Sequence, residues 1–169
     1  MKLNIISIFF PFFFFSIAGW VLEVVYRSIR KRSFVNPGLL KGPYLSLYGT
    51  GSLILLGCIF YFKESPFFIK IILYFIATTG LELISAFISN HFFHKRLWDY
   101  SDQRFQYKGH VCLKFSIYWI FLAFFFEYLL FPLYQNLYND LSHNIKFLFI
   151  LVVFILMLVD FIFLCIKKD

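Results

Sequence analysis

Residues 5–22 read IISIFFPFFFFSIAGWVL, eighteen positions without one charged side chain. An α-helix rises about 1.5 Å per residue, so about 20 apolar residues cross the roughly 30 Å hydrocarbon core of a bilayer. A surface helix of a soluble protein would carry a polar face along such a length. The run therefore predicts a helix that spans a membrane.

The composition extends this prediction to the whole chain. The 169 residues are 61% hydrophobic, 24% aromatic and 15% charged, whereas an average soluble domain is about 25% charged. Lipid offers backbone groups no hydrogen bonds, so each span is expected to be helical. We predict an all-α, polytopic membrane helix bundle with about five transmembrane helices, forming a single integral membrane domain over residues 1–169. The predicted spans are Ile5 to Tyr26, Tyr44 to Phe62, Phe67 to Asn90, Phe115 to Tyr134 and Ile145 to Ile166, with Pro66 and Pro132 marking helix ends.

Lysine and arginine residues are distributed unequally between the two sides of this topology. Twelve fall in the two long loops and the C-terminal tail, and four fall on the other side, at Lys2, Lys63, Lys70 and Lys146. Because short cytoplasmic loops carry the excess of basic residues, we expect an N-terminus outside the cell membrane and a C-terminus in the cytoplasm. Ser16-Ile17-Ala18 resembles a signal-peptide cleavage site. The apolar run continues past it, which favours an uncleaved helix.

Other functional classes find little support in the sequence. The net charge of +7 comes from basic residues beside the spans, which is typical of membrane orientation, so we predict no nucleic-acid partner. His91 and His94 have a metal-like spacing, but no ligand set closes around them, and the three cysteines are far apart. We therefore predict no metal and no cofactor. A nucleophile with a partner base is also missing, so we predict no enzyme.

Four acidic residues lie inside the predicted spans, where an ionised side chain is costly: Glu23, Glu82, Glu127 and Asp160. Glu23 and Glu82 lie on stripes of small and polar residues, which predicts that they face the bundle interior. Arg27 follows Glu23 by one turn and is expected to pair with it. No cation lies within one turn of Glu82, so Glu82 is the first candidate for binding a substrate or ion, followed by Glu23 and Asp160. Apolar neighbours surround Glu127 and Asp160 on their own helices, so their partners are expected from another helix.

The two glutamate helices begin units of similar organisation. Each is followed by a basic loop and a glycine-containing return, Gly42-Pro43-Tyr44 in the first unit and Gly109-His110-Val111 in the second. This pattern predicts a parallel duplication of a helical hairpin, with a fifth helix appended. In the first return, we expect Gly42-Pro43 to start the second helix and Gly49 and Gly51 to allow close contact with the Glu23 helix.

Two stretches carry a resemblance to a known family. Residues 19–51, GWVLEVVYRSIRKRSFVNPGLLKGPYLSLYGTG, and 97–119, LWDYSDQRFQYKGHVCLKFSIYW, resemble the CmpB-like putative ABC-transporter permease family of bacterial membrane proteins. The family pattern has Asn-Arg-Gly-Phe where this chain has Asn36-Pro37-Gly38-Leu39, so no role of that arginine carries over. The matching positions are Gly19, Trp20, Glu23, Asn36, Gly38, Gly42, Pro43, Tyr48, Gly49, Glu82, Trp98, Asp99, Tyr100, Ser101, Gly109 and Ser116.

The resemblance implies a permease component that moves a small solute or cation. It adds Asn36 and Gly42 to the candidate binding residues, and a loop motif of Trp98, Asp99, Tyr100 and Ser101. Gly49-Thr50-Gly51-Ser52 lacks the lysine of a nucleotide-binding loop, so an ATPase would be a separate chain. The expected partners are the lipid bilayer, that ATPase and a second copy in a homodimer. The alternative is a non-transporting scaffold or regulator, which binds anionic lipid or a partner through its basic cytoplasmic loops.

Overall fold

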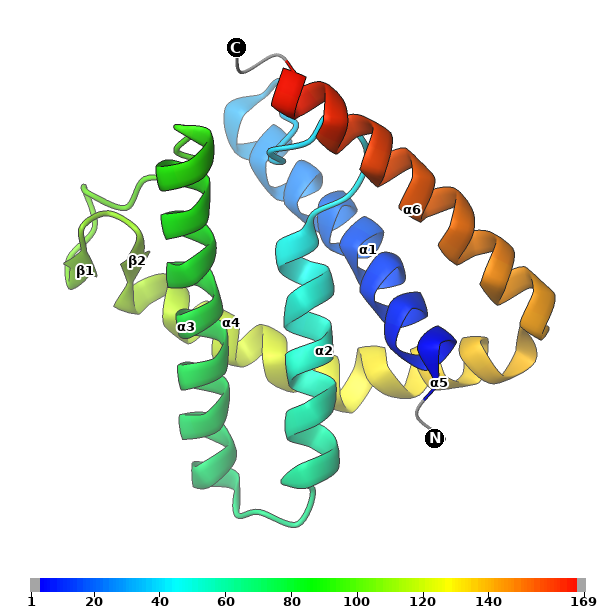
Figure 1. The fold of residues 1–169 in the computed structure, drawn as a ribbon. Coiled ribbons are helices and arrows are strands. Elements are labelled where there is room, and N and C mark those ends of the chain that lie inside the picture. The colour runs from blue at the N-terminus through cyan, green and yellow to red at the C-terminus, as the bar shows by residue number, and fades with distance from the viewer. Residues whose placement is uncertain (1–3, 167–169) are drawn as a thin grey trace. The chain divides into compact units, whose positions relative to one another are not determined.

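The computed structural model describes residues 4–166, which form long helices with one short β-hairpin (Figure 1). The prediction of an all-α membrane protein is confirmed, because the hairpin is the only sheet in the described part of the chain and consists of two two-residue strands. The elements in chain order are α1 (Ile5–Lys31), α2 (Ser46–Tyr61), α3 (Phe67–Phe93), β1 (Gln106–Tyr107), β2 (Val111–Cys112), α4 (Leu113–Phe125), the π-helical turn η1 (Phe126–Leu130), α5 (Phe131–Asp140) and α6 (His143–Ile166).

Four helical segments are long and apolar enough to cross a membrane: Ile5–Lys31, Phe67–Phe93, Leu113–Asp140 and His143–Ile166. The remaining predicted span, Tyr44 to Phe62, corresponds to α2, whose 16 residues, though apolar, reach only about 24 Å at 1.5 Å per residue. The five predicted segments are therefore all present as helices, and their ends shift by a few residues. The predicted positions of Lys2, Lys167 and Lys168 lie outside the described residues.

Pro132 does not end its helix, contrary to the prediction. The helical segment continues through α5 to Asp140. A proline inside a helix removes the backbone donor to the preceding turn and crowds that turn's carbonyl. Here the turn before Pro132 is the π-helical η1, which holds the wider i→i+5 spacing and includes Glu127. The widened turn accommodates the proline without ending the helix.

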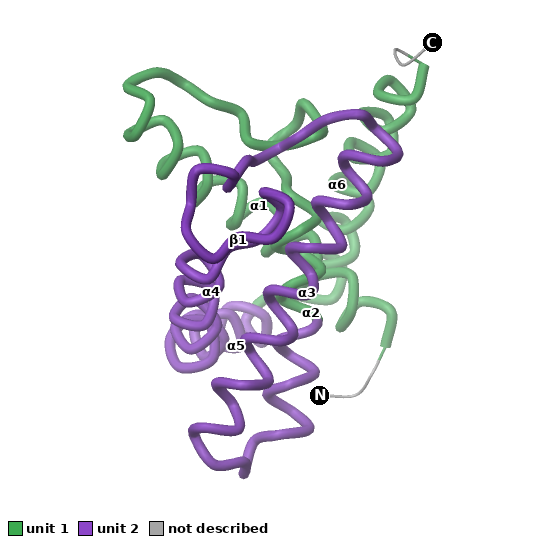
Figure 2. Tube along the Cα trace, turned by 90° about the vertical axis from the view of Figure 1, so that its left-hand side faces the viewer, with its two compact units in different colours: residues 1–53, 141–169 green, residues 54–140 purple. Residues whose placement is uncertain are grey.

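The chain divides into two compact units (Figure 2). The first comprises Met1–Leu53 and Leu141–Asp169, and the second comprises Ile54–Asp140, so α2 begins in one unit and ends in the other. The prediction of a single domain over the whole chain stays a prediction.

In the first unit, α1 packs along α6 through phenylalanine rings. The ring centroids of Phe10 and Phe149 are 5.1 Å apart. The start of α2 also lies close to α1, because a Cβ on Gly49 would meet the Ser16 hydroxyl and the Phe12 carbonyl oxygen. The predicted close contact at Gly49 is confirmed.

In the second unit, α3 packs against α4, with the ring of Phe124 lying 4.9 Å from that of Phe67 and 5.1 Å from that of Tyr74. The hairpin precedes α4 and contacts α3 through β2. Each unit therefore contains one of the two glutamate helices, α1 with Glu23 in the first and α3 with Glu82 in the second.

Helix α2 begins at Ser46, later than the predicted start at Gly42-Pro43. The intervening residues are engaged elsewhere, since the Leu45 amide donates to the Ser16 carbonyl at 2.9 Å. The Gly42 amide donates to the Asp160 carboxylate. These bonds hold residues 41–45 outside the helix and against α1 and α6.

Candidate functional site

The four acids predicted inside the spans each accept a hydrogen bond from a tyrosine hydroxyl within their own unit. Burying a carboxylate is costly unless hydrogen bonds replace the lost water, and a charge-assisted bond is stronger than a neutral one. A tyrosine supplies such a donor while its ring stays in an apolar setting. The donor–acceptor pairs are Tyr48–Glu23 at 2.8 Å, Tyr44–Asp160 at 3.1 Å, Tyr74–Glu127 at 2.7 Å and Tyr100–Glu82 at 2.9 Å.

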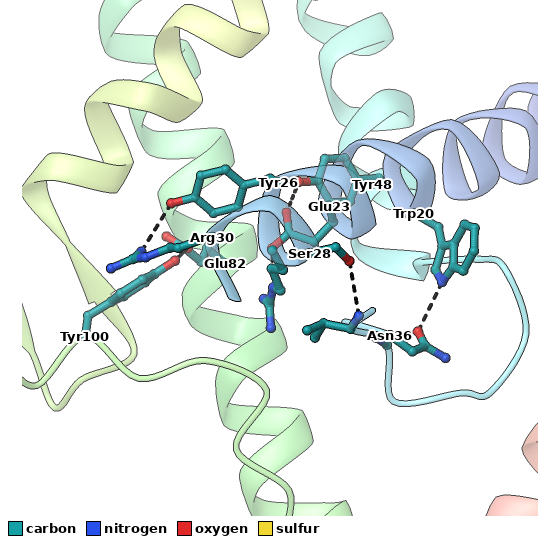
Figure 3. Close-up of polar contacts among 12 residues, drawn as sticks. Trp20, Glu23, Tyr26, Ser28, Arg30, Asn36, Tyr48, Glu82 and Tyr100 are labelled. Carbon is teal, nitrogen blue, oxygen red and sulfur yellow. Dashed lines mark hydrogen bonds and ion pairs between the residues drawn. The ribbon is translucent and has the colours of Figure 1, made fainter. Parts of the chain in front are cut away.

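Glu23 uses both carboxylate oxygens. Oε1 lies 2.7 Å from Nε of Arg27, one turn along α1, so the predicted i,i+4 ion pair is present. Oε2 accepts from the Tyr48 hydroxyl at the start of α2 (Figure 3). A Cβ on Gly19 would overlap the Tyr48 ring, so the glycine permits the approach that this bond requires. Glu23 thereby joins α1 to the start of α2, the two helices of the first helical hairpin.

Asp160 on α6 binds the loop before α2. Its Oδ2 accepts from the backbone amides of Lys41 at 2.7 Å and Gly42 at 2.8 Å, and from the Tyr44 hydroxyl. The prediction of partners from another helix is wrong here, because all three donors come from the loop. The sequence marked the glycine-containing return, but backbone amides make no sequence pattern, so nothing in the sequence paired them with Asp160.

Asn36 organises the same loop from within. Its Oδ1 accepts from the Trp20 indole at 3.0 Å (Figure 3) and from the Gly38 amide at 3.1 Å. Its Nδ2 donates to the Lys41 carbonyl at 2.9 Å. Asn36 and Gly42 are thus joined to the loop that Asp160 holds, and their role in binding a ligand stays a prediction.

Glu127 forms a buried ion pair with Lys70, so the prediction of a partner on another helix is confirmed. The Lys70 Nζ lies 2.5 Å from Oε1 of Glu127, and the side chains are 8% and 9% exposed. Tyr74 donates to Oε2 from one turn further along α3, on the same face as Lys70.

Lys70 lies in the first turn of α3, as Lys146 lies in the first turn of α6. The orientation that follows from the charge count stays a prediction. A lysine inside the apolar run of residues 67–76 was the sequence signal for a buried pair.

Glu82 is buried in the second unit, with 2% of its surface exposed to solvent. Its Oε1 accepts from the Tyr100 hydroxyl, which comes from the loop that follows α3 (Figure 3). The Tyr100 ring stacks on Phe115 of α4, with centroids 4.6 Å apart. Thr78 and Ser89 belong to the polar stripe of Glu82 on α3. Thr78 donates to the Tyr74 carbonyl and Ser89 to the Lys95 carbonyl.

The loop motif places Tyr100 through a set of internal bonds. The Trp98 indole donates to the His110 carbonyl at 2.8 Å. The Tyr100 amide donates to the Gly109 carbonyl at 3.0 Å. Both bonds tie residues 98–100 to the hairpin, so the predicted motif and Glu82 belong to one structure.

Asp99 braces the motif from its exposed side. Its Oδ1 accepts from the Ser101 hydroxyl at 2.6 Å and the Ser101 amide at 2.8 Å, and lies 2.9 Å from Arg96. The Ser101 hydroxyl and amide, followed by the Arg96 charge, lower the pKa of the Asp99 carboxyl. Gly109, with φ +69°, leaves the space these side chains fill, since a Cβ there would overlap Arg96.

Among residues 4–166, no three His, Cys, Asp or Glu side chains gather in a group that could hold a metal ion. His91, His94 and His110 instead share the lining of one groove beside α3.

Comparison with known proteins gives the chain its family. No curated protein and no solved structure matches the sequence. The family model described as "Putative ABC-transporter type IV" matches residues 10–165, a range that includes Glu23, Glu82, Glu127 and Asp160. Together with the four membrane-length helices, this match makes the chain a multi-pass membrane protein. The chain belongs to this family, CmpB, as its sequence motifs predict.

Proposed function

We propose that the chain is the membrane-spanning component of a transporter and that Glu82 binds a cation, either a coupling ion or the cationic group of a small solute. Membership of an ABC-transporter family supports the transport role. The observation that carries the cation site is a carboxylate 2% exposed within a span, bonded to a hydroxyl from a loop. Intramembrane carboxylates typically mark ion and substrate pathways.

The other three acids have bonds that a bound cation would have to replace. Glu23 and Glu127 are each bonded to a basic side chain, and displacing that cation would leave a second charge unpaired. Asp160 accepts from two backbone amides, which are fixed by the loop. Glu82 accepts from the Tyr100 hydroxyl, and a bound cation interacts more strongly with a carboxylate than a neutral hydroxyl does.

The mechanism follows from where the two partners lie. Glu82 is 11 residues from the end of α3, or about 16 Å inside at 1.5 Å per residue. Tyr100 lies on a loop that the hairpin braces, so the loop can move as a body without unfolding a helix. In the proposed cycle, the cation displaces the Tyr100 hydroxyl from Glu82, and the return of the loop restores the bond when the cation leaves.

Carbodiimide labelling tests the site and needs no identified substrate. Dicyclohexylcarbodiimide modifies carboxyl groups in apolar surroundings, and mass spectrometry locates the label. We expect sodium, potassium or tetramethylammonium ions to protect Glu82 in the purified chain, and Glu127, already paired with Lys70, to show no such protection. Glu82→Gln provides the unlabelled control. Labelling of Glu82 that none of these cations reduces would refute the cation site.

We also propose a separate ATPase chain as the source of energy, because the family is named for ABC transporters and the sequence has no nucleotide-binding loop. Affinity purification from native membranes is expected to recover a protein with a GxxxxGK[ST] motif. Recovery of the chain alone, or of a homodimer alone, under conditions that preserve other transporter complexes would contradict this partner.

The alternative role, a scaffold or regulator that acts through basic loops, has one supporting observation. Arg30, Lys31 and Arg32 are exposed at the end of α1. Neutralising these three residues while leaving Glu82 intact separates the two proposals. Loss of cellular function in that variant, with unchanged cation protection at Glu82 and unchanged recovery of the ATPase, would favour the scaffold.

A further inference from the structure

A groove of about 600 Å³ lies in the second unit, between the C-terminal part of α3 and the β-hairpin. Figure 1 shows the hairpin beside α3, and β2 contacts that helix. Leu83, Ile84 and Phe87 form the apolar part of the lining. The polar end is formed by Asn90, His91, His94, Lys108 and His110. None of these residues belongs to the acid–tyrosine pairs.

The lining of the groove changes from polar to apolar along α3, from His94 back to Leu83. A bilayer changes in the same way, from its headgroups to its acyl chains. Helix α3 has 27 residues, so it is about 40 Å long and exceeds the roughly 30 Å hydrocarbon core. Its C-terminal residues therefore reach the headgroup region. From His94 back to Leu83 the helix covers about 16 Å, which is enough to run from headgroups into acyl chains.

The polar end of the groove is basic. Lys108 and three histidines, His91, His94 and His110, line it, and no acidic residue does. An anion is the ligand that this set of donors suits.

Lys108 occupies a position that its backbone does not favour. It and Gly109 have φ of 51° and 69° at the turn of the hairpin, where asparagine and glycine are preferred. The His110 amide closes this turn on the Tyr107 carbonyl at 2.9 Å. Since turn geometry does not favour a lysine, the position of its ammonium group, 5.5 Å from the Tyr107 ring centroid, points to a role for the side chain.

The apolar part of the lining decides between a lipid and a small anion. Ile84 and Phe87 are each 57% exposed, and a free phosphate ion would leave this surface uncovered. An acyl chain would cover it. We propose that the groove binds an anionic phospholipid, with the phosphate at Lys108, His94 and Asn90 and one acyl chain along Leu83, Ile84 and Phe87.

Native mass spectrometry of the full chain tests this proposal. The protein is delipidated in detergent and exposed to equal amounts of phosphatidylglycerol and phosphatidylcholine. We expect selective retention of phosphatidylglycerol, and a loss of about tenfold in its affinity in a Lys108→Ala/His94→Ala variant, since each removes a contact to a charged phosphate. Lys95→Ala is the matched control, because Lys95 is exposed at the same end of α3 but does not line the groove.

A second variant distinguishes a lipid from a free anion. Ile84→Asn places a polar group under the proposed acyl chain, so it is expected to weaken phosphatidylglycerol binding. The affinity of the polar end for inorganic phosphate is expected to be the same as in the wild type. Circular dichroism with size-exclusion chromatography verifies that each variant folds. Equal retention of the two lipids, an equal loss in Lys95→Ala, or no effect of Ile84→Asn would each overturn the proposal.

Discussion

The buried ion pair between Lys70 and Glu127 allows a quantitative prediction. At the observed 2.5 Å, the attraction amounts to about 6 to 7 kcal/mol for an effective dielectric constant of about 20, and desolvation costs several kcal/mol per ion. The pair therefore contributes little net stability, whereas either charge left alone is costly. We expect Lys70→Met or Glu127→Met alone to lower the free energy of unfolding by about 3 to 5 kcal/mol.

The double variant separates charge pairing from hydrogen bonding. Lys70→Met/Glu127→Met removes both charges, but it leaves the hydroxyl of Tyr74, a residue 1% exposed, without its acceptor, at a cost of about 1 to 3 kcal/mol. Adding Tyr74→Phe should remove that cost, so the triple variant is expected within about 1 kcal/mol of the wild type or above it.

The assay is an SDS titration in mixed micelles, followed by far-UV circular dichroism. It yields the free energy of unfolding for the two single variants, the double and the triple. We expect strong coupling between the two charges. Destabilisation of the double variant by the sum of the two single losses would mean that the charges act independently, which would contradict the pairing.

Three further perturbations test other contacts. Gly49→Ala should cost about 1 to 3 kcal/mol in the same titration because its Cβ would meet α1, whereas Gly57→Ala, with open space around it, should cost nothing; equal effects would contradict the close approach. Asp160→Ala orphans two loop amides, so trypsin should cut faster after Lys41, and an unchanged rate would contradict this anchoring. The pKa of Asp99 is lower in the folded protein than in the unfolded chain. The bonds of Asp99 therefore stabilise the loop at pH values above the unfolded pKa of about 3.9, and this stabilisation is lost as the pH falls through the folded pKa. Hydrogen exchange should show this acid-induced loosening of the loop, and Asp99→Asn should abolish it.

The sequence predicted contacts that follow from helical spacing. Hydropathy located the membrane-length helices, since length and apolar content alone define a span. The Glu23–Arg27 pair was predictable because residues four apart share a helix face. The prolongation of the fourth span beyond Pro132 was not, because it depends on the local widening of one helical turn.

The remaining contacts of the acids depend on how segments pack. Glu127 meets Lys70 across 57 positions of sequence, and Asp160 meets Gly42 across 118. Periodicity within one helix says which face a residue occupies, but it does not say which other segment covers that face. The intramembrane lysine and the glycine-rich return marked the partners as unusual without assigning them.

The shared tyrosine contacts change how variants of the acids should be designed. Each acid–tyrosine bond joins segments at least 18 residues apart, so each carboxylate contributes to the fold of its unit whatever else it does. Replacement by alanine removes charge and acceptor together, and it leaves a buried hydroxyl unsatisfied. Replacement by glutamine keeps an acceptor oxygen and removes the charge. Loss of transport in Glu82→Gln, in a chain that still folds, would therefore report on the missing charge, whereas the same loss in Glu82→Ala could follow from a displaced Tyr100 loop.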